Sequence, residues 1–242
     1  MPRAAQPHAH TSVEEIIHPH EDMLADTPDQ AAGPDYHADK AKAIAALREP
    51  GVRCCRCDLC ATRTQVVFGE GSPVARLMIV GEAPGADEDK SGHPFWGRAG
   101  QVLNSLLDEA GISREEIWIT NTVKCRPTNM QGKRVSNRPP RVPEIKACTI
   151  WRAGELDIIK PRIVCCLGSV AARAIAGRDV RMTEERGSWL PFSLPIEGME
   201  NSELIMTYHP SYIMRQQGEA YDRIRGQAVA DFGIIAAKLR SF

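Results

Sequence analysis

The stretch Leu77-Met78-Ile79-Val80-Gly81-Glu82-Ala83-Pro84-Gly85 joins four consecutive apolar residues to a loop of small, acidic and turn-forming residues. Three further apolar runs occur at residues 117–120, Ile163–Leu167 and 204–207, and each also ends in a loop. Helical spacing of apolar residues appears at residues 41–47, 101–110, 144–159, Ser169–Ala176 and 221–239. Continuous apolar strands that alternate with helices predict an α/β fold with a parallel sheet covered on both faces.

The ends of these four strands carry residues suited to chemistry. Glu82 follows the first strand, Asn121 the second, Gly168-Ser169 the third and His209 the fourth. Ligands of open α/β sheets bind at the carboxyl ends of the strands. We therefore expect a carboxylate, an amide and an imidazole to face one crevice.

Length and composition describe an ordinary globular protein. The chain has 242 residues, enough for one domain of roughly 200 residues plus an appendage. Residues 1–35 lack periodicity and are interpreted as a mobile N-terminal tail, and residues 36–242 as a single domain. The formal net charge is −1, so any contact with nucleic acid must come from a local patch. No apolar run is long enough to span a membrane and no secretory leader pattern is present, which together predict a cytoplasmic protein.

Eight cysteines need an explanation in such a chain, because disulfides are disfavoured in the cytoplasm. Cys165 and Cys166 lie inside an apolar run and are interpreted as small core residues. The other six flank polar or loop-like sequence and form an inventory of possible metal ligands: Cys54, Cys55, Cys57, Cys60, Cys125 and Cys148. Four thiolates suit either zinc or an iron–sulfur cluster, and the residues alone leave that choice open.

Several longer motifs follow one another along the chain. They are Val66-Val67-Phe68-Gly69-Glu70-Gly71, then Gly81-Glu82-Ala83-Pro84-Gly85-Ala86-Asp87-Glu88-Asp89 with Gly92-His93-Pro94-Phe95-Trp96-Gly97-Arg98-Ala99-Gly100, then Thr120-Asn121-Thr122-Val123-Lys124-Cys125-Arg126-Pro127, and finally His209-Pro210-Ser211-Tyr212. Together they resemble the family 4 uracil-DNA glycosylases, over about residues 50–240. The resemblance implies a three-layer α/β/α sandwich around a four-stranded parallel sheet, and a 4Fe–4S cluster.

The resemblance also implies a function. Enzymes of this family are DNA repair hydrolases that flip uracil out of DNA and hydrolyse its N-glycosidic bond, which leaves abasic-site DNA and free uracil. No lysine is evidently placed as a Schiff-base nucleophile, so we expect a monofunctional glycosylase that does not cut the strand. Uracil-containing DNA is the expected partner, and the protein is expected to act as a monomer.

Chemistry and resemblance together assign the substrate residues. By resemblance, Phe95 stacks on the base. Asn121 has both an acceptor and donors, so it can pair with the N3–H and O4 edge of uracil, whereas cytosine presents the wrong polarity. His209 is expected to hydrogen-bond uracil O2, together with the backbone of the loop formed by Ala83, Pro84 and Gly85.

The water-activating group is less sharply defined. Glu82 is the candidate for organising the water or stabilising the cationic sugar, and the predicted catalytic set is Glu82, Asn121 and His209. The acidic run Asp87, Glu88 and Asp89 competes for the same role, and Asp87 is also assigned to substrate binding.

The same resemblance selects four cluster ligands. Cys54, Cys57, Cys125 and Cys148 fall on the ligand positions of the family. Cys57-x-x-Cys60 has the same spacing as Cys54-x-x-Cys57, so Cys57 and Cys60 remain an alternative pair. The expected task of the cluster is to hold two distant segments beside the DNA, without redox turnover.

Positive charge gathers in one part of the chain. The stretch from 124 to 141 is locally basic because it contains Lys124, Arg126, Lys133, Arg134, Arg138 and Arg141. Among these six residues, Lys133, Arg134 and Arg138 are expected to contact phosphate. Ser211, at an expected helix start, and Arg215 one turn later are assigned to phosphate as well.

The basic loop is longer than in typical family 4 members. Its Gly132-Lys133-Arg134 opening resembles relatives that trap uracil-DNA covalently through a histidine, but Asn137, a poor nucleophile, stands at the matching position. The alternative function is therefore a low-turnover binder of uracil-containing or abasic DNA that uses the same pocket and residues 131–141.

Overall fold

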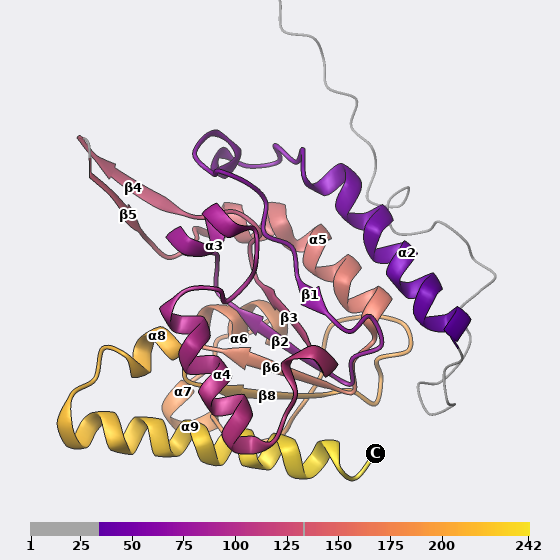
Figure 1. The fold of residues 1–242 in the computed structure, drawn as a ribbon, viewed down its shortest axis with the longest axis vertical. Helices are drawn as coiled ribbons and strands as arrows, with labels where there is room; N and C mark the ends of the chain where they lie inside the picture. The colour runs from indigo at the N-terminus through magenta and orange to yellow at the C-terminus, as the bar shows by residue number, and fades with distance from the viewer. Residues whose placement is uncertain (1–33, 133) are drawn as a thin grey trace, which may run out of the picture.

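The computed structural model describes residues 34–132 and 134–242, and they form a three-layer α/β/α sandwich (Figure 1). The predicted tail, up to residue 33, and the predicted phosphate contact of Lys133 lie outside the described residues. Helix α2 (Pro34–Gly51) includes the expected short helix at 41–47 and also Pro34 and Asp35, which the sequence interpretation had placed in the tail.

Four parallel strands form the centre of the sheet, as predicted. They are β3 (Trp118–Asn121), β2 (Leu77–Gly81), β6 (Ile163–Leu167) and β8 (Glu203–Thr207), in that spatial order. Two-residue antiparallel strands, β1 (Glu70–Gly71) and β7 (Leu190–Pro191), extend the two edges and were not predicted. Two residues give too short a pattern to detect from sequence.

Alternation along the strands divides the core into two halves. Ile79, Cys165 and Ile205 pack on one face against α4 (Arg98–Ala110) and α9 (Gly218–Leu239). Val80 and Cys166 pack on the other, against α5 (Val142–Ile159), α6 (Ser169–Ala176) and α2. Both faces are buried, so the middle of each strand is apolar, and each fully buried aliphatic side chain contributes about 1.5–3 kcal/mol. Cys165 and Cys166 are core residues, as expected.

The remaining elements lie mostly in the connections. They are the 3-10 helices η1 (Asp58–Ala61) and η2 (Arg114–Glu116), the short helices α3 (Ala86–Ser91), α7 (Met182–Glu185) and α8 (Pro210–Ile213), and the strands β4 (Thr128–Gln131) and β5 (Arg134–Asn137). Strands β4 and β5 form a separate antiparallel hairpin that projects from the body, where the sequence indicated only a loop. In the described part of the chain, every helix is too short or too polar to cross a lipid bilayer.

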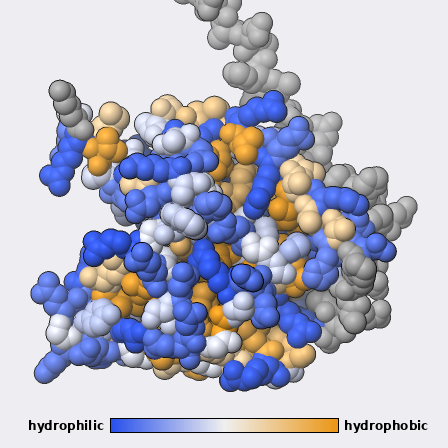
Figure 2. All heavy atoms as spheres, in the orientation of Figure 1, coloured by the Kyte–Doolittle hydropathy of each residue, from blue (hydrophilic) through white to orange (hydrophobic). Residues whose placement is uncertain are grey.

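The carboxyl ends of the central strands define one side of the molecule. The arrowheads of β2, β6 and β8 point to the side on which the hairpin and α8 lie (Figure 1). On this side the surface is hollowed between the hairpin and the lobe that contains α8 and α9 (Figure 2). The predicted strand-end residues therefore face a concave part of the surface.

Candidate active site

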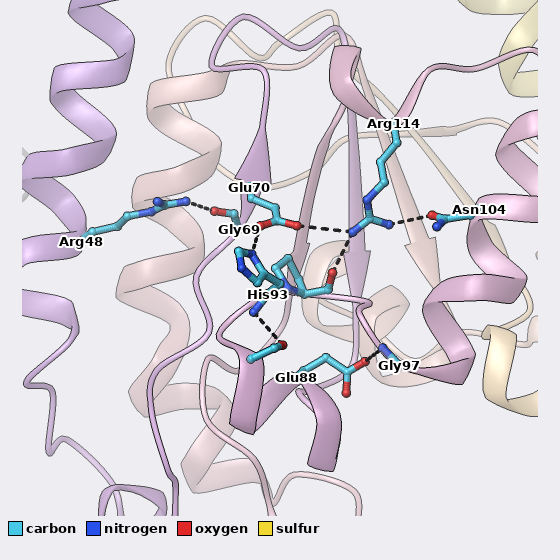
Figure 3. Close-up of polar contacts among 10 residues, drawn as sticks. Arg48, Gly69, Glu70, Glu88, His93, Gly97, Asn104 and Arg114 are labelled. Carbon is cyan, nitrogen blue, oxygen red and sulfur yellow. Dashed lines mark hydrogen bonds and ion pairs between the residues drawn. The ribbon is translucent and has the colours of Figure 1, made fainter.

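The loop after β2 is held by one buried carboxylate. Glu88, in α3, accepts the backbone N–H of Gly85 at 3.0 Å through one oxygen. Its other oxygen accepts the backbone N–H of Gly97 at 2.9 Å (Figure 3). It thereby fastens the Gly81–Gly85 loop to the start of α4. Asp89 is also buried and accepts the N–H of Thr64 at 2.9 Å. Of the acidic run, only Asp87 is exposed, so Glu88 and Asp89 serve the structure of the loop.

Phe95 sits in a backbone conformation that few non-glycine residues adopt. Its φ is +52°, in the left-handed region. Gly100 makes the turn possible, because a Cβ at that position would overlap the Phe95 carbonyl. Arg114 fixes the turn by donating to the carbonyl oxygen of Pro94 at 2.8 Å and to Asn104 at 2.9 Å (Figure 3). Such local strain is typical of functional sites.

A second set of contacts supports the same turn from outside. His93 Nδ1 lies 2.8 Å from Glu70 Oε2, and Glu70 also faces Arg114 at 3.5 Å (Figure 3). The His93 ring in turn stacks on exposed Trp96, with ring centroids 5.1 Å apart. These contacts hold the segment around Phe95 in place, and none of them involves the Phe95 ring.

Asn121 ends β3 with a buried side chain. The residue is 2% exposed, and its Oδ1 has no hydrogen-bond partner among the described residues. A buried acceptor left unpaired costs about 1–3 kcal/mol. Gly81 lies directly beside it, because a Cβ at position 81 would overlap Asn121 Oδ1 and lie 2.5 Å from the Phe95 ring. The amide, the aromatic ring and the bare backbone of Gly81 therefore border one space.

His209 is positioned opposite Phe95, with ring centroids 5.8 Å apart. It is the N-cap of α8, and its Nδ1 accepts the backbone N–H of Ser211 at 3.1 Å. Burial, reinforced by the positive charge of Arg215, lowers the pKa of His209 to about 4. The neutral imidazole therefore carries its proton on Nε2, which is a free donor for a ligand.

Glu82 lies half-buried in the same area. Burial raises the pKa of Glu82, and the charge of exposed Arg215 acts in the opposite direction. The charge of Arg215 thus acts on both Glu82 and His209. The Ser211 N–H that was expected to serve a phosphate is used instead by the His209 ring.

The predicted backbone donors of the loop are fewer than expected. The N–H of Gly85 is taken by Glu88, and Pro84, which is buried, has none. Ala83 is half-buried and packs against the core cluster of Phe68 and Trp151. The loop therefore offers few free backbone donors, and the side chain of His209 is the donor that remains near Phe95.

The four predicted ligand cysteines line one cavity. Cys54, Cys57, Cys125 and Cys148 border one open hollow, whereas Cys55 and Cys60 do not border it. In the described residues, no three His, Cys, Asp or Glu side chains are gathered around a single point. All eight cysteines are free thiols.

Donors surround the sulfur atoms of this cysteine cavity. Trp151 Nε1 donates to Cys54 at 3.3 Å, the backbone N–H of Lys124 to Cys148 at 3.2 Å, and Arg63 to Cys125 at 3.5 Å. Burial raises the pKa of Cys125 to about 12 and of Cys148 to about 11, against the opposing effect of Arg63 and Lys124 respectively. Such N–H···S contacts are what a set of anionic thiolates around a cluster requires.

The hairpin contains basic residues with different surroundings. Arg138 is fully engaged: it contacts Glu144 at 2.6 and 2.8 Å and the carbonyl oxygen of Thr128 at 3.1 Å. It anchors the hairpin to α5 instead of facing solvent. Arg134, by contrast, is exposed, and Arg141 next to α5 is exposed too.

The base of the hairpin reaches the substrate loop. Arg126 Nε donates to Asn137 Oδ1 at 2.7 Å. The Asn137 amide nitrogen lies 3.6 Å from the place that a Cβ on Gly85 would take. Sequence interpretation singled out Asn137 but could not place it, and it gave no role to Gly100 or Arg114. The only signal for Gly100 was its position inside a quoted motif, and Arg114 had none.

The fold is α/β, and an unpaired buried amide, an aromatic ring and a neutral imidazole come together at the carboxyl ends of its central strands. The profile of the uracil DNA glycosylase superfamily matches residues 68–233, and the chain belongs to that superfamily. The chain is 40% identical to the type-4 uracil-DNA glycosylase of Thermotoga maritima over 173 residues, which are 71% of this chain and 83% of the relative.

Other relatives agree. The type-4 uracil-DNA glycosylase of Pyrobaculum aerophilum is 39% identical over 172 residues, 70% of this chain and 84% of the relative. A type-5 uracil-DNA glycosylase of Thermus thermophilus is 32% identical over 124 residues, 45% of this chain and 53% of the relative. The predicted family is therefore confirmed.

Proposed function

We propose that this protein removes uracil from DNA by hydrolysing the N-glycosidic bond, as a monofunctional DNA repair glycosylase. The observation that carries the proposal is the unpaired, buried Oδ1 of Asn121, which borders the same space as Phe95 and Gly81, while the ring of His209 lies opposite Phe95. A flipped base fits such a space by stacking and by hydrogen bonds along its edge. The type-4 names of the relatives support the same activity.

Base discrimination belongs to Asn121. Its Oδ1 accepts from uracil N3–H and its Nδ2 donates to O4, whereas cytosine offers an acceptor at N3 and a donor at C4. A mismatch leaves buried polar groups unpaired, which gives strong rejection. Phe95 supplies the stacking face, and its ring is already buried at 6% exposure.

The leaving group is stabilised by His209. Bond cleavage puts negative charge on uracil O2, and the neutral Nε2–H donor is aimed at that charge before the reaction begins. A pKa of about 4 keeps this ring neutral at physiological pH. The positive charge of Arg215 adds to the favourable field for the departing anion.

Glu82 and Asp87 act on the sugar side. Glu82 stabilises the oxocarbenium character of the sugar and orients the attacking water. Asp87, the exposed member of the acidic run, binds the substrate next to it. Lys124, beside Asn121, is paired with buried Glu155 at 2.5 Å and is not available as a Schiff-base nucleophile, which supports hydrolysis without strand cleavage.

Cys54, Cys57, Cys125 and Cys148 would hold a 4Fe–4S cluster. Their shared cavity and the N–H donors around their sulfur atoms fit an anionic cluster, and the pair Cys54/Cys57 is favoured over Cys57/Cys60 because Cys60 does not border the cavity. Such a cluster can transfer electrons, but here it would serve to fasten the segment around Cys54 to α5. Eight free thiols agree with a reducing, cytoplasmic location.

A second candidate function is retention of abasic DNA after uracil release. The position of Asn137, whose amide nitrogen lies 3.6 Å from the place that a Cβ on Gly85 would take, favours it. The exposed Arg134 and the exposed apolar pair Met130 and Val135 on the hairpin would contact the DNA, with the protein acting as a monomer. Release of abasic DNA should be faster after deletion of residues 131–138, and unchanged release would reject this candidate.

The proposed activity is tested by uracil release. The protein is incubated with a labelled oligonucleotide that contains one uracil, and the strand is then cleaved with alkali. We expect alkali-dependent cleavage at the uracil and none without alkali. A matched oligonucleotide with cytosine should remain intact. Undiminished binding to uracil-containing DNA without any release would contradict the enzyme and favour the binder.

A further inference from the structure

Two buried carboxylates occupy equivalent positions in the two helical layers. Glu155 in α5 accepts the hydroxyl of Thr120 at 2.7 Å, and Asp231 in α9 accepts the hydroxyl of Thr207 at 2.5 Å. Both threonines are completely buried, and the carboxylates are 1% and 2% exposed. Thr120 is the residue before Asn121 at the end of β3. Thr207 is the last residue of β8, two before His209.

Each carboxylate also has a cationic partner that reaches toward the site. Lys124 pairs with Glu155 at 2.5 Å and donates to the backbone carbonyl of Asn121 at 3.0 Å. Arg186 pairs with Asp231 at 2.6 Å, and its guanidinium lies 5.3 Å from the ring centre of Tyr208, which precedes His209. Both arrangements therefore contain a threonine, a carboxylate and a cation; the first reaches Asn121 itself, and the second reaches Tyr208, the neighbour of His209.

Stability alone does not explain this repetition. A buried ion pair loses so much hydration that well-packed apolar residues of similar volume often stabilise a protein equally well. A saturated polar network does, however, fix the geometry of the groups it joins. Asn121 in particular needs support from behind, because its own Oδ1 has no partner among the described residues.

We propose that these two threonine–carboxylate–cation triads are separate positioning devices, the Glu155 triad for Asn121 and the Asp231 triad for His209. The inference rests on the proposed function and adds to it two sets of residues that do not touch the base. Small displacements of catalytic groups are costly, since an error of about 1 Å can reduce a rate about 100-fold. The Glu155 triad holds the side chain of Thr120 and the backbone carbonyl of Asn121, and the Asp231 triad holds the side chain of Thr207 and faces the ring of Tyr208, the two residues before His209.

The test is a set of double-mutant cycles. Thr120→Val and Thr207→Val remove one hydroxyl each at nearly constant volume, and each is made in the wild-type, Asn121→Ala and His209→Ala backgrounds. Single-turnover uracil release at excess enzyme keeps the weak variants measurable. In the wild-type background each valine variant should lower the rate about tenfold, the value of one net hydrogen bond.

The test depends on how the effect of each valine substitution changes between the wild-type, Asn121→Ala and His209→Ala proteins. Thr120→Val should have no further effect once Asn121 is alanine, but should keep its full effect when His209 is alanine. Thr207→Val should show the reverse. General damage to the fold would instead lower the rate by the same factor in every background. Equal factors in all backgrounds, or no effect in the wild-type background, would overturn the proposal.

Controls separate positioning from folding. Thr120→Ser and Thr207→Ser retain the hydroxyl and should restore the rate. Thr149→Val in α5 is a matched control, because that exposed hydroxyl bonds only the carbonyl of Ile145 in its own helix. Where a valine variant does not fold, the alanine variant carries the same expectation. A wild-type rate for Asn121→Ala itself would contradict the proposed function, independently of the threonine results.

Discussion

Gly81→Ala tests whether the space beside Asn121 is the base pocket. The added Cβ would overlap Asn121 Oδ1 and lie 2.5 Å from the Phe95 ring, whereas ordinary contacts begin at 3.4 Å. The ring would have to retreat by about 0.9 Å, or the amide by a similar distance. Misplacement of this size reduces a rate about 100-fold, which is about 2.7 kcal/mol in the barrier.

The effect on stability should be smaller. An extra methyl in a packed site costs about 1–3 kcal/mol, and about 1 kcal/mol lowers the unfolding midpoint of a domain of this size by roughly 2–4 °C. Gly226→Ala is the matched control: a Cβ on this exposed glycine of α9 would have no atom within 4 Å, so the rate should not change and stability should rise by up to about 1 kcal/mol.

The assay is kcat/KM for uracil release from a labelled oligonucleotide, with thermal unfolding followed by circular dichroism. A folded Gly81→Ala protein that releases uracil at the wild-type kcat/KM would refute the placement of the base between Asn121 and Phe95. A loss of activity accompanied by unfolding at the assay temperature would be repeated at a lower temperature, where the folded variant must still show the loss.

Three further outcomes are expected. His209 has a pKa of about 4 in the folded protein and of 6.5 in the unfolded chain, so between these two pH values the unfolded chain binds a proton that the folded protein does not. The free energy of unfolding should therefore decrease as the pH falls from 6.5 to about 4. Urea titrations of His209→Ala should lack this part of the pH dependence. Iron content per protein should fall in Cys54→Ser and persist in Cys60→Ser, and the reverse would select the other ligand pair. Glu88→Gln, which weakens the two backbone contacts of the loop, should reduce kcat about tenfold with little change in the discrimination of uracil from cytosine.

The strands and main helices could be predicted because burial leaves a strong pattern in the sequence. A strand such as Ile163–Leu167 is covered on both faces, so every residue in it is apolar. The hairpin β4–β5 leaves no such pattern, because all but one of its residues are exposed and six of the eight are polar. Its pairing is fixed locally by the turn and by Arg138, whose partner Glu144 lies in the next helix.

The sequence could propose members of the candidate site from the type of residue at each strand end. It could not predict which way a side chain turns or which backbone conformation a residue adopts. Asn121 and His209 could be predicted because each stands at or just after the end of a strand. In the structure His209 faces the Phe95 ring, and Asn121 lies beside Gly81 and that ring. The sequence could not show that Glu88 turns inward while Asp87 remains exposed, because that depends on the register of α3. Positive φ at Phe95 likewise has no sequence signal.

The number of basic residues in the sequence between 124 and 141 exceeds the number of side chains that are exposed and able to contact a DNA phosphate. Lys124 is buried with Glu155, Arg138 is bound to Glu144, and half-buried Arg126 donates to Asn137. Of the counted cations, Arg134 and Arg141, together with Arg215 outside this stretch, remain exposed and form no ion pair among the described residues.

About three phosphate contacts give a slope near −3 for log affinity against log salt concentration, at about −0.9 per contact on duplex DNA. Arg134→Ala should therefore reduce the slope by about 1 and weaken all sequences alike. Arg138→Ala should leave the slope unchanged but strand the buried carboxylate of Glu144, which lowers the unfolding midpoint by several degrees. Fluorescence anisotropy over a series of salt concentrations measures the slope. A steeper slope that Arg138→Ala reduces would show that this arginine leaves Glu144 to bind DNA.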